Sequence, residues 1–149
     1  MRKIIIIFFI FFFFLSGNAY SKNEFFLTLR NDKVNLRQGP SFDYPVKIFY
    51  KKKFLPVLIQ DKSDNFRKIR DHENNTGWIH MSQLSKKKAA IVIENELTLF
   101  KSPTIYSYPI AILKKGRLLR VKKCKNDWCK IITGDFKGWV KKESLWGLM

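Results

Sequence analysis

The feature that most constrains the fold of this chain is an internal repeat with a period of about 61 to 63 residues. The segment LRQGPSFDYPVKIFYKKKFLPV begins at Leu36, and the similar segment LFKSPTIYSYPIAILKKGRLLRV begins at Leu99. The alignment pairs the prolines of the two copies, Pro40 with Pro103 and Pro45 with Pro109. A repeat of this length is too long for a solenoid unit and suits two very small domains in tandem.

The match extends through the rest of each copy. Val46-x-Ile48 aligns with Ile110-x-Ile112, Phe54-Leu55-x-Val57 with Leu118-Leu119-x-Val121, NFRKIR with DWCKII, and TGWIHMSQL with KGWVKKESL. Strands are predicted at residues 46–50 and 54–60 in the first copy, and at residues 110–113 and 118–124 in the second. About five short strands per copy, with frequent turn signals and no sustained helical period, indicate a small β-barrel or sandwich.

The first strand of each copy ends at a proline. Val34 to Ser41, VNLRQGPS, alternates apolar and polar residues and then stops at Gly39-Pro40. Proline has no N–H for a strand ladder and restricts the residue before it, so the chain leaves the sheet there. Since Ser102 replaces Gly39 in the second copy, this position need not have a positive φ.

The N-terminus has the three parts of a secretory signal peptide. Arg2 and Lys3 precede an unbroken apolar run, Ile4 to Leu15, and small residues follow at Gly17-Asn18-Ala19. The run is shorter than the roughly 20 residues of a membrane-spanning helix, which is the alternative. We therefore predict a signal peptide at residues 1–21, cleaved after Ala19 or Ser21, and a periplasmic or secreted protein with no transmembrane segment after cleavage.

Basic residues outnumber acidic residues strongly. The formal net charge is +17, and loss of Arg2 and Lys3 with the signal peptide lowers it to +15. Such a chain is attracted to polyanions, although a solvated lysine-rich surface explains the same composition. Export argues against nucleic acid as the physiological partner. Two lysine runs, Lys51–Lys53 and Lys86–Lys88, are read either as a solvated turn and linker or as contacts with anionic lipid or wall polymer.

The motifs carry a family resemblance. VNLRQGPS, followed by YPV, F-x-K-I and GWI, resembles the bacterial SH3 domain family, and LTLFKSPT, YPI, DWCKI and GWV resemble a second, more divergent copy. The closing ESLWGL is similar to the end of a two-copy exported form of alphaproteobacteria. The resemblance covers Leu27 to Leu148 and implies two tandem SH3-like β-barrels, at residues 22–85 and 86–149. The second copy departs from the motif at Phe100, where the first has Arg37, and at Ser102.

Aromatic residues are the candidates for ligand binding. Trp78 and Trp139 each follow a glycine, and are interpreted either as a platform for a peptide or sugar or as tryptophans that close a small core. Tyr44 and Tyr108 lie in the proline-flanked loops together with Phe42 and Tyr106. SH3-like folds bind extended ligands at this place, and packing within the loop is the alternative.

The remaining reactive residues do not point to catalysis. Cys124 and Cys129 flank a predicted hairpin turn, where a disulfide is expected if the two residues are directly opposed, with two buried free thiols as the alternative. Two cysteines with no companion histidine are too few ligands for a metal site, so no metal or cofactor is expected. His72 and His80 have no nucleophile or base in a recognisable arrangement, so we predict that the chain is not an enzyme.

The resemblance implies a non-catalytic binding module of the cell envelope, with peptidoglycan or a wall-associated peptide as the first ligand class. Two alternatives stay open at this stage. One is an adaptor whose partner is another envelope protein, and the other is a salt-sensitive binder of polyanions or membrane surfaces that depends on the positive charge.

Overall fold

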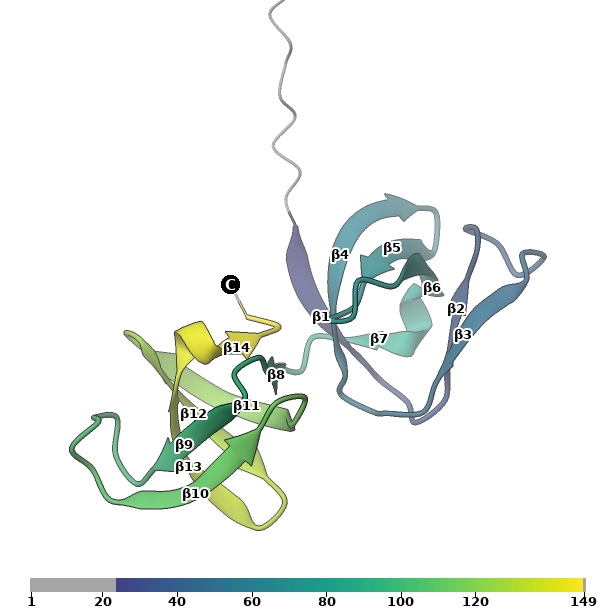
Figure 1. Ribbon diagram of the computed structural model, residues 1–149. Coiled ribbons are helices and arrows are strands. Elements are labelled where there is room, and N and C mark those ends of the chain that lie inside the picture. Colours follow the sequence, from purple (N-terminus) through teal and green to yellow (C-terminus); the bar gives the residue numbers. More distant parts are fainter. Residues whose placement is uncertain (1–23, 149) are drawn as a thin grey trace, which may run out of the picture.

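The computed structural model describes residues 24–148, which form two antiparallel seven-stranded sheets in succession (Figure 1). The predicted signal peptide, residues 1–21, lies outside the described residues. The prediction of an all-β chain with two tandem domains is confirmed. Within the described residues, no helix is long and apolar enough to cross a membrane.

The first sheet contains β1 (Phe25–Leu29), β2 (Val34–Arg37), β3 (Val46–Tyr50), β4 (Pro56–Ser63), β5 (Phe66–Arg70), β6 (Thr76–His80) and β7 (Leu84–Ser85), with a 3₁₀ turn η1 (Met81–Gln83). The second contains β8 (Ala89–Val92), β9 (Glu96–Phe100), β10 (Pro109–Lys114), β11 (Leu118–Lys125), β12 (Trp128–Thr133), β13 (Phe136–Lys141) and β14 (Leu145–Trp146), with η2 (Lys142–Ser144). The strand orders, β3-β2-β6-β5-β4-β1-β7 and β10-β9-β13-β12-β11-β8-β14, are equivalent. The sequence repeat is therefore a repeat of topology.

Each domain has its own small core, built from the inward-facing residues of alternating strands. In β2, Val34 and Leu36 are buried while Asn35 and Arg37 are only partly covered. Leu36 packs with Val57, Ile69 and Ile79 in the first core. The equivalent residues of the second core include Leu99, Leu119, Ile131 and Val140. Side chains alternate between the two faces of a strand, so every second residue enters the core. Even a short strand therefore contributes to the core.

Strand register corrects part of the sequence alignment. Arg37 pairs with Trp78 in the first sheet and Phe100 with Trp139 in the second, so Leu36 and Leu99 are equivalent, as aligned. The next strands differ from the alignment. Leu36 pairs with Ile48 but Leu99 pairs with Ala111, which shifts the equivalence in β3 and β10 by one residue.

The shift reaches two residues in β4 and β11. Ile59 pairs with Ile69 and Val121 with Ile131, so the counterpart of Val121 is Ile59 rather than Val57. The turn before β4 is one residue longer than the turn before β11, because three residues separate Tyr50 from Phe54 and two separate Leu113 from Gly116. Phe54 and Gly116, which both have a positive φ, 65° and 80°, occupy equivalent positions in these turns. The strand predicted from Phe54 consequently begins only at Pro56.

A buried carboxylate organises the first domain. Asp71, which is 1% exposed at the end of β5, accepts a hydrogen bond of 2.8 Å from the hydroxyl of Tyr50. It also accepts hydrogen bonds from the backbone N–H groups of Glu73 and Asn75 and from the amide of Asn75. Burial first, and then the neighbouring Asp71, raises the pKa of Tyr50 far above its ordinary value. Because every one of these donors is satisfied, the carboxylate holds the β5–β6 turn in place.

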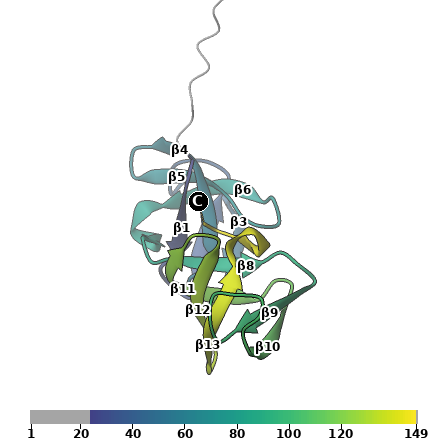
Figure 2. The same ribbon diagram turned by 90° about the vertical axis from the view of Figure 1, so that its left-hand side faces the viewer.

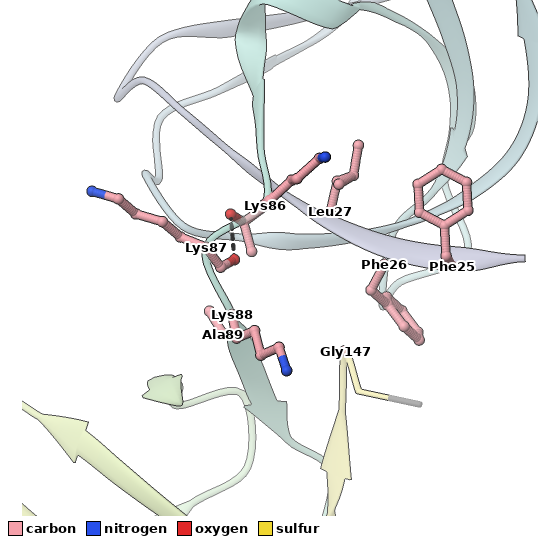
Figure 3. A pocket seen from close by; sticks show the side chains of 9 residues that line it. Phe25, Phe26, Leu27, Lys86, Lys87, Lys88, Ala89 and Gly147 are labelled. Carbon is pink, nitrogen blue, oxygen red and sulfur yellow. Dashed lines mark hydrogen bonds between the residues drawn. The ribbon is translucent and has the colours of Figure 1, made fainter. Parts of the chain in front are cut away.

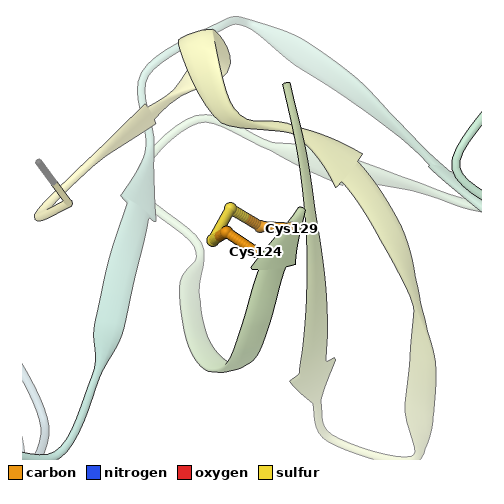
Figure 4. The surroundings of a disulfide bond; sticks show 2 residues. All are labelled: Cys124 and Cys129. Atoms are coloured by element: carbon orange, nitrogen blue, oxygen red, sulfur yellow. A yellow bond between two sulfur atoms is a disulfide. The ribbon is translucent and has the colours of Figure 1, made fainter. Parts of the chain in front are cut away.

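The second domain has a disulfide in the hairpin formed by β11 and β12. Cys124 of β11 and Cys129 of β12 are directly opposed, with Cα atoms 4.0 Å apart, and their sulfur atoms are bonded (Figure 4). Cys129 is fully buried in the second core. Among the described cysteines none is free. The disulfide therefore anchors the end of the β11–β12 hairpin to the core.

The two domains pack against each other. The ring of Trp146 lies edge-on to the ring of Phe26, with centroids 4.9 Å apart, and Thr28 donates a hydrogen bond of 2.9 Å to the carbonyl of Lys87 in the linker. Ile91 of β8 is buried in the core cluster of the first domain. In both views β8 lies at the junction of the two domains (Figures 1 and 2).

Candidate ligand-binding site

The loop between β2 and β3 in the first domain is shaped by Arg37. Its guanidinium group donates hydrogen bonds to the carbonyl oxygens of Phe42, at 3.0 Å, and Tyr44, at 2.8 Å. The same group lies over the ring of Phe42, 5.4 Å from its centroid. One fixed cation thus satisfies two loop carbonyls and supports one exposed ring, which keeps the loop in a single conformation.

Three rings meet at the base of this loop. The centroids of Phe42, Phe66 and His80 lie 5.1 to 5.2 Å apart, in edge-on and tilted arrangements. Phe66 begins β5 and His80 ends β6, and the two residues are directly paired across the strands. Phe42 comes from the loop and remains 65% exposed. We call Phe42, Phe66 and His80 the aromatic cluster.

The aromatic cluster borders an open hollow of about 360 Å³. Asp43 and Asp64 line the same hollow, with Pro40, Ser41 and Asn65. Asp43 is held by a local turn, because its Oδ2 accepts a hydrogen bond from the hydroxyl of Ser41 and its backbone N–H donates to that hydroxyl. The hollow therefore offers apolar ring faces beside carboxylates, which suits a ligand with both an apolar part and hydrogen-bond donors.

The imidazole of His80 has a defined structural role. Its Nδ1 accepts a hydrogen bond of 3.3 Å from the backbone N–H of Ser82 and lies 2.7 Å from the Ser82 hydroxyl, so it caps η1. A backbone N–H can only donate, so the neutral ring carries its proton on Nε2. His80, which has no recognisable catalytic arrangement in the sequence, belongs to the aromatic cluster in the structure.

The predicted site residues Tyr44 and Tyr108 do not join this cluster. The ring of Tyr44 packs on Gly39, where an added Cβ would meet the ring at 2.6 Å, and the side chain is half exposed. Gly39 is needed for this close approach, and its φ is not positive. Tyr108 is 75% exposed in the second domain, where its carbonyl oxygen accepts a hydrogen bond from Lys101.

Trp78 and Trp139 lie on the outer faces of the two sheets, half buried, and belong to neither core cluster. The glycine before each tryptophan faces inward, because a Cβ on Gly77 would meet Leu36 at 2.7 Å and one on Gly138 would meet Leu99 at 2.9 Å. Two lysines, Lys123 and Lys130, lie 5.8 Å from the ring centroid of Trp139. The tryptophans thus cover the sheet from outside rather than close the barrel.

The aromatic cluster is not reproduced in the second domain. Phe100 replaces Arg37 and contacts Trp128, the counterpart of Phe66, with ring centroids 5.7 Å apart. Lys141 stands where the first domain has His80. The loop is held by Ser107, whose hydroxyl accepts a hydrogen bond from the N–H of Ser102, and Tyr106 is left 90% exposed. The two loops therefore present different surfaces.

The sequence predicts the loop aromatics as site residues, but it does not single out Phe66 or Arg37. A signal existed, because the aligned segments NFRKIR and DWCKII place an aromatic residue at position 66 and at position 128. In the part of the chain that the structure describes, no three His, Cys, Asp or Glu side chains are grouped so that they could hold a metal ion.

Comparison with known proteins agrees with the fold. The family model described as bacterial SH3 domain matches residues 30–86 and residues 94–147. A comparison with curated proteins gives no match. Solved structures with similarity include NlpC2 from Trichomonas vaginalis, with 12% identity, a TM-score of 0.38, and coverage of 84% of this chain and 48% of that chain.

Two further solved structures show similar values. NlpC1 from Trichomonas vaginalis has 12% identity and a TM-score of 0.37, covering 87% of this chain and 48% of that chain. An NlpC/P60 family protein from Bacillus cereus has 10% identity and a TM-score of 0.38, covering 81% of this chain and 55% of that chain. This chain thus spans about half the length of these structures. Likeness at this level supports no conclusion about activity.

The family matches decide the classification. Together they cover well over half of the chain, and each falls on one of the two sheets, beginning just after its first strand. This chain therefore belongs to the bacterial SH3 domain family and contains two copies of the domain in tandem.

Proposed function

We propose that this chain is an exported, non-catalytic binding module of the cell envelope that recognises peptidoglycan or a wall-associated peptide. The observation that carries the proposal is the hollow beside the aromatic cluster, in which the exposed ring of Phe42 lies next to the carboxylates of Asp43 and Asp64. Membership of the bacterial SH3 domain family and the signal-peptide pattern at residues 1–21 support a role in the cell envelope.

The chemistry of the hollow favours an extended peptide. Apolar faces of Phe42 and Phe66 cover the methyl and methylene groups of such a ligand, and the carboxylates of Asp43 and Asp64 accept hydrogen bonds from its amino or amide groups. The positive charge elsewhere on the surface attracts the ligand's carboxylates and speeds encounter. Arg37 keeps Phe42 in place before the ligand arrives, which lowers the entropy lost on binding.

The test is sedimentation of the mature protein, residues 22–149, with purified peptidoglycan at low and at high salt. Apolar contact predicts binding that survives high salt, since salt screens only the charged contribution. Phe42→Ala is expected to weaken binding about fivefold or more, as truncation of a central aromatic contact does. Tyr44→Ala is expected to weaken it less than Phe42→Ala, because Tyr44 packs on Gly39 beside the hollow.

Lys52→Ala is the matched control, because Lys52 is exposed in the β3–β4 turn and lines none of the hollows described here. It is expected to leave binding within about twofold. Equal losses for Phe42→Ala and Lys52→Ala, or binding that disappears at high salt, would reject recognition by the aromatic cluster.

A protein partner is the second candidate function, and the second domain favours it. Ile105, Tyr106 and Tyr108 are all more than half exposed in one loop, where the first domain has the ordered Arg37 loop. Exposed apolar residues grouped in one loop are typical of protein interaction sites. In-cell cross-linking from position 106 to one envelope protein, without wall binding by the purified chain, would support this adaptor role.

A further inference from the structure

Three hollows that share lining residues lie along β1 at the junction of the two domains. Their volumes are about 270, 500 and 280 Å³, and Phe25 lines all three. Leu27 and Lys86 are common to the first and second, and Phe26 and Lys88 to the first and third. They therefore form one continuous surface, which we call the β1 face.

Apolar and basic residues predominate on the β1 face. Lys86 and Lys88 extend to the side of β1 where Phe25 and Phe26 lie, whereas Lys87 extends the opposite way (Figure 3). Arg30 and Arg67 line the second hollow beside Met81. None of the described residues that line these three hollows is acidic, in contrast to the hollow of the aromatic cluster.

The arrangement is fixed by the packing of the domains. Thr28 of β1 binds the carbonyl oxygen of Lys87, and Trp146 packs on Phe26, so the linker lysines are held beside β1 rather than on a free linker. Phe25 and Met81 stay 46% exposed although both are large and apolar. A ligand that matches the β1 face therefore has apolar groups to cover these side chains and negative charges to meet the lysines.

The boundary of a bilayer that contains anionic lipid has this combination of groups. Aromatic and methionine side chains enter the region between headgroups and acyl chains, while lysine and arginine reach lipid phosphates. The described lining of the β1 face includes basic side chains and no acidic one, which is complementary to the negative charge of such a surface.

We propose that the β1 face docks on membranes that contain anionic lipid, with Phe25 and Met81 entering the interfacial region and Lys86 and Lys88 binding lipid phosphates. The surface is separate from the aromatic cluster and does not depend on peptidoglycan recognition. A chain with both surfaces holds its wall-binding domain next to a membrane.

The test is sedimentation of the mature protein, residues 22–149, with vesicles of phosphatidylcholine, with and without phosphatidylglycerol. Binding is expected only to the vesicles with phosphatidylglycerol. The double variant Lys86→Glu and Lys88→Glu is expected to weaken it about tenfold or more, because each lysine near an anionic surface contributes to the attraction. Phe25→Ser is expected to weaken binding as well, since the apolar contribution is lost.

The matched control is the double variant Lys101→Glu and Lys137→Glu, which changes the net charge equally at positions that line none of the three hollows. It is expected to bind vesicles within about fourfold of the original protein, since only long-range charge is altered. Unchanged thermal unfolding and unchanged sedimentation with peptidoglycan show that each variant is folded, and separate this proposal from the one above.

Four results would overturn the proposal: no binding to phosphatidylglycerol vesicles, equal binding to vesicles of phosphatidylcholine alone, equal losses for the two double variants, or no effect of Phe25→Ser. A concentration-dependent dimer in analytical ultracentrifugation that Phe25→Ser abolishes would assign the β1 face to a second copy of the chain instead.

Discussion

The two domains share one strand topology but are stabilised by different local interactions. At the end of β5 the first domain buries Asp71, which binds Tyr50 and the turn that follows. The equivalent position in the second domain is Thr133, whose hydroxyl accepts a hydrogen bond of 2.7 Å from Arg117 and donates to the carbonyl of Leu118. The second domain adds the disulfide between β11 and β12. One barrel thus depends on a buried polar network, and the other on a covalent link.

The β2–β3 loop of the first domain and the β9–β10 loop of the second are also held by different side chains. Arg37 orders the first loop through two carbonyls and one ring, while Phe100 takes its place in the second domain and packs on Trp128. Because strand order and core are common to both domains, the difference lies in side chains at equivalent backbone positions. The barrel therefore tolerates either arrangement, while the surface that each loop presents depends on whether arginine or phenylalanine occupies this position.

The largest effect is expected from Asp71→Ala. It leaves the hydroxyl of Tyr50 and two backbone N–H groups without their acceptor in a buried site, so we expect the first domain to lose about 3 kcal/mol or more of unfolding free energy. Urea unfolding, followed by residue-resolved NMR to separate the domains, measures the change. Thr133→Ala is the matched variant in the second domain, with an expected loss of about 1–2 kcal/mol. Similar losses for both variants would contradict the distinction.

Removal of the disulfide tests the other domain. Cys124→Ala with Cys129→Ala is expected to lower the unfolding free energy of the second domain by about 2 kcal/mol, the loss calculated for so short a loop. A reducing agent should produce a similar loss in the original protein and none in the first domain. An equal effect of reduction on both domains would show that the domains unfold as one unit.

High pH is expected to lower the unfolding free energy of the first domain relative to the second, by less than the substitutions above. Burial and Asp71 raise the pKa of Tyr50 above its ordinary value of 10.0, so the unfolded chain loses this proton at a lower pH than the folded chain. The contribution to stability is complete below pH 10 and falls above it, by about 1.4 kcal/mol per pH unit. Unfolding measured from pH 9 to 11 should show this fall in the first domain, where Tyr50→Phe abolishes it. Leu113 occupies the equivalent position in the second domain.

The smallest effect is expected at an exposed ion pair. Lys114 donates a hydrogen bond to the carboxylate of Glu96 and lowers the pKa of that group. A lowered pKa stabilises the folded state above the ordinary pKa of a glutamate, and this contribution is lost as the pH falls through the lowered value. Lys114→Ala should return the NMR titration of Glu96 towards its ordinary midpoint and leave thermal unfolding unchanged. A clear fall in the unfolding temperature would show that the pair matters for stability.

Part of the candidate site was predictable from the sequence. The loops between the prolines were predicted as the binding region, and Phe42 lies there in the aromatic cluster. The convergence of Phe42, Phe66 and His80 was not predictable, because it depends on the pairing of β5 with β6 and on the path of the Arg37 loop. The outward position of Trp78 follows from alternation, since Gly77 and Ile79 share the inward face of β6.

The repeat and the all-β class were predictable from the sequence, because two-residue alternation, turn residues and prolines act locally. About five strands per copy were expected, whereas each sheet has seven. The register between the two copies became visible only from strand pairing, since Leu36 pairs with Ile48 and Leu99 with Ala111, and no local sequence pattern marks that shift. The tertiary structure also decided that Trp146 joins the domains and leaves Phe25 exposed beside the linker lysines. Contacts between distant segments depend on the packing of whole sheets, and no local pattern encodes that packing.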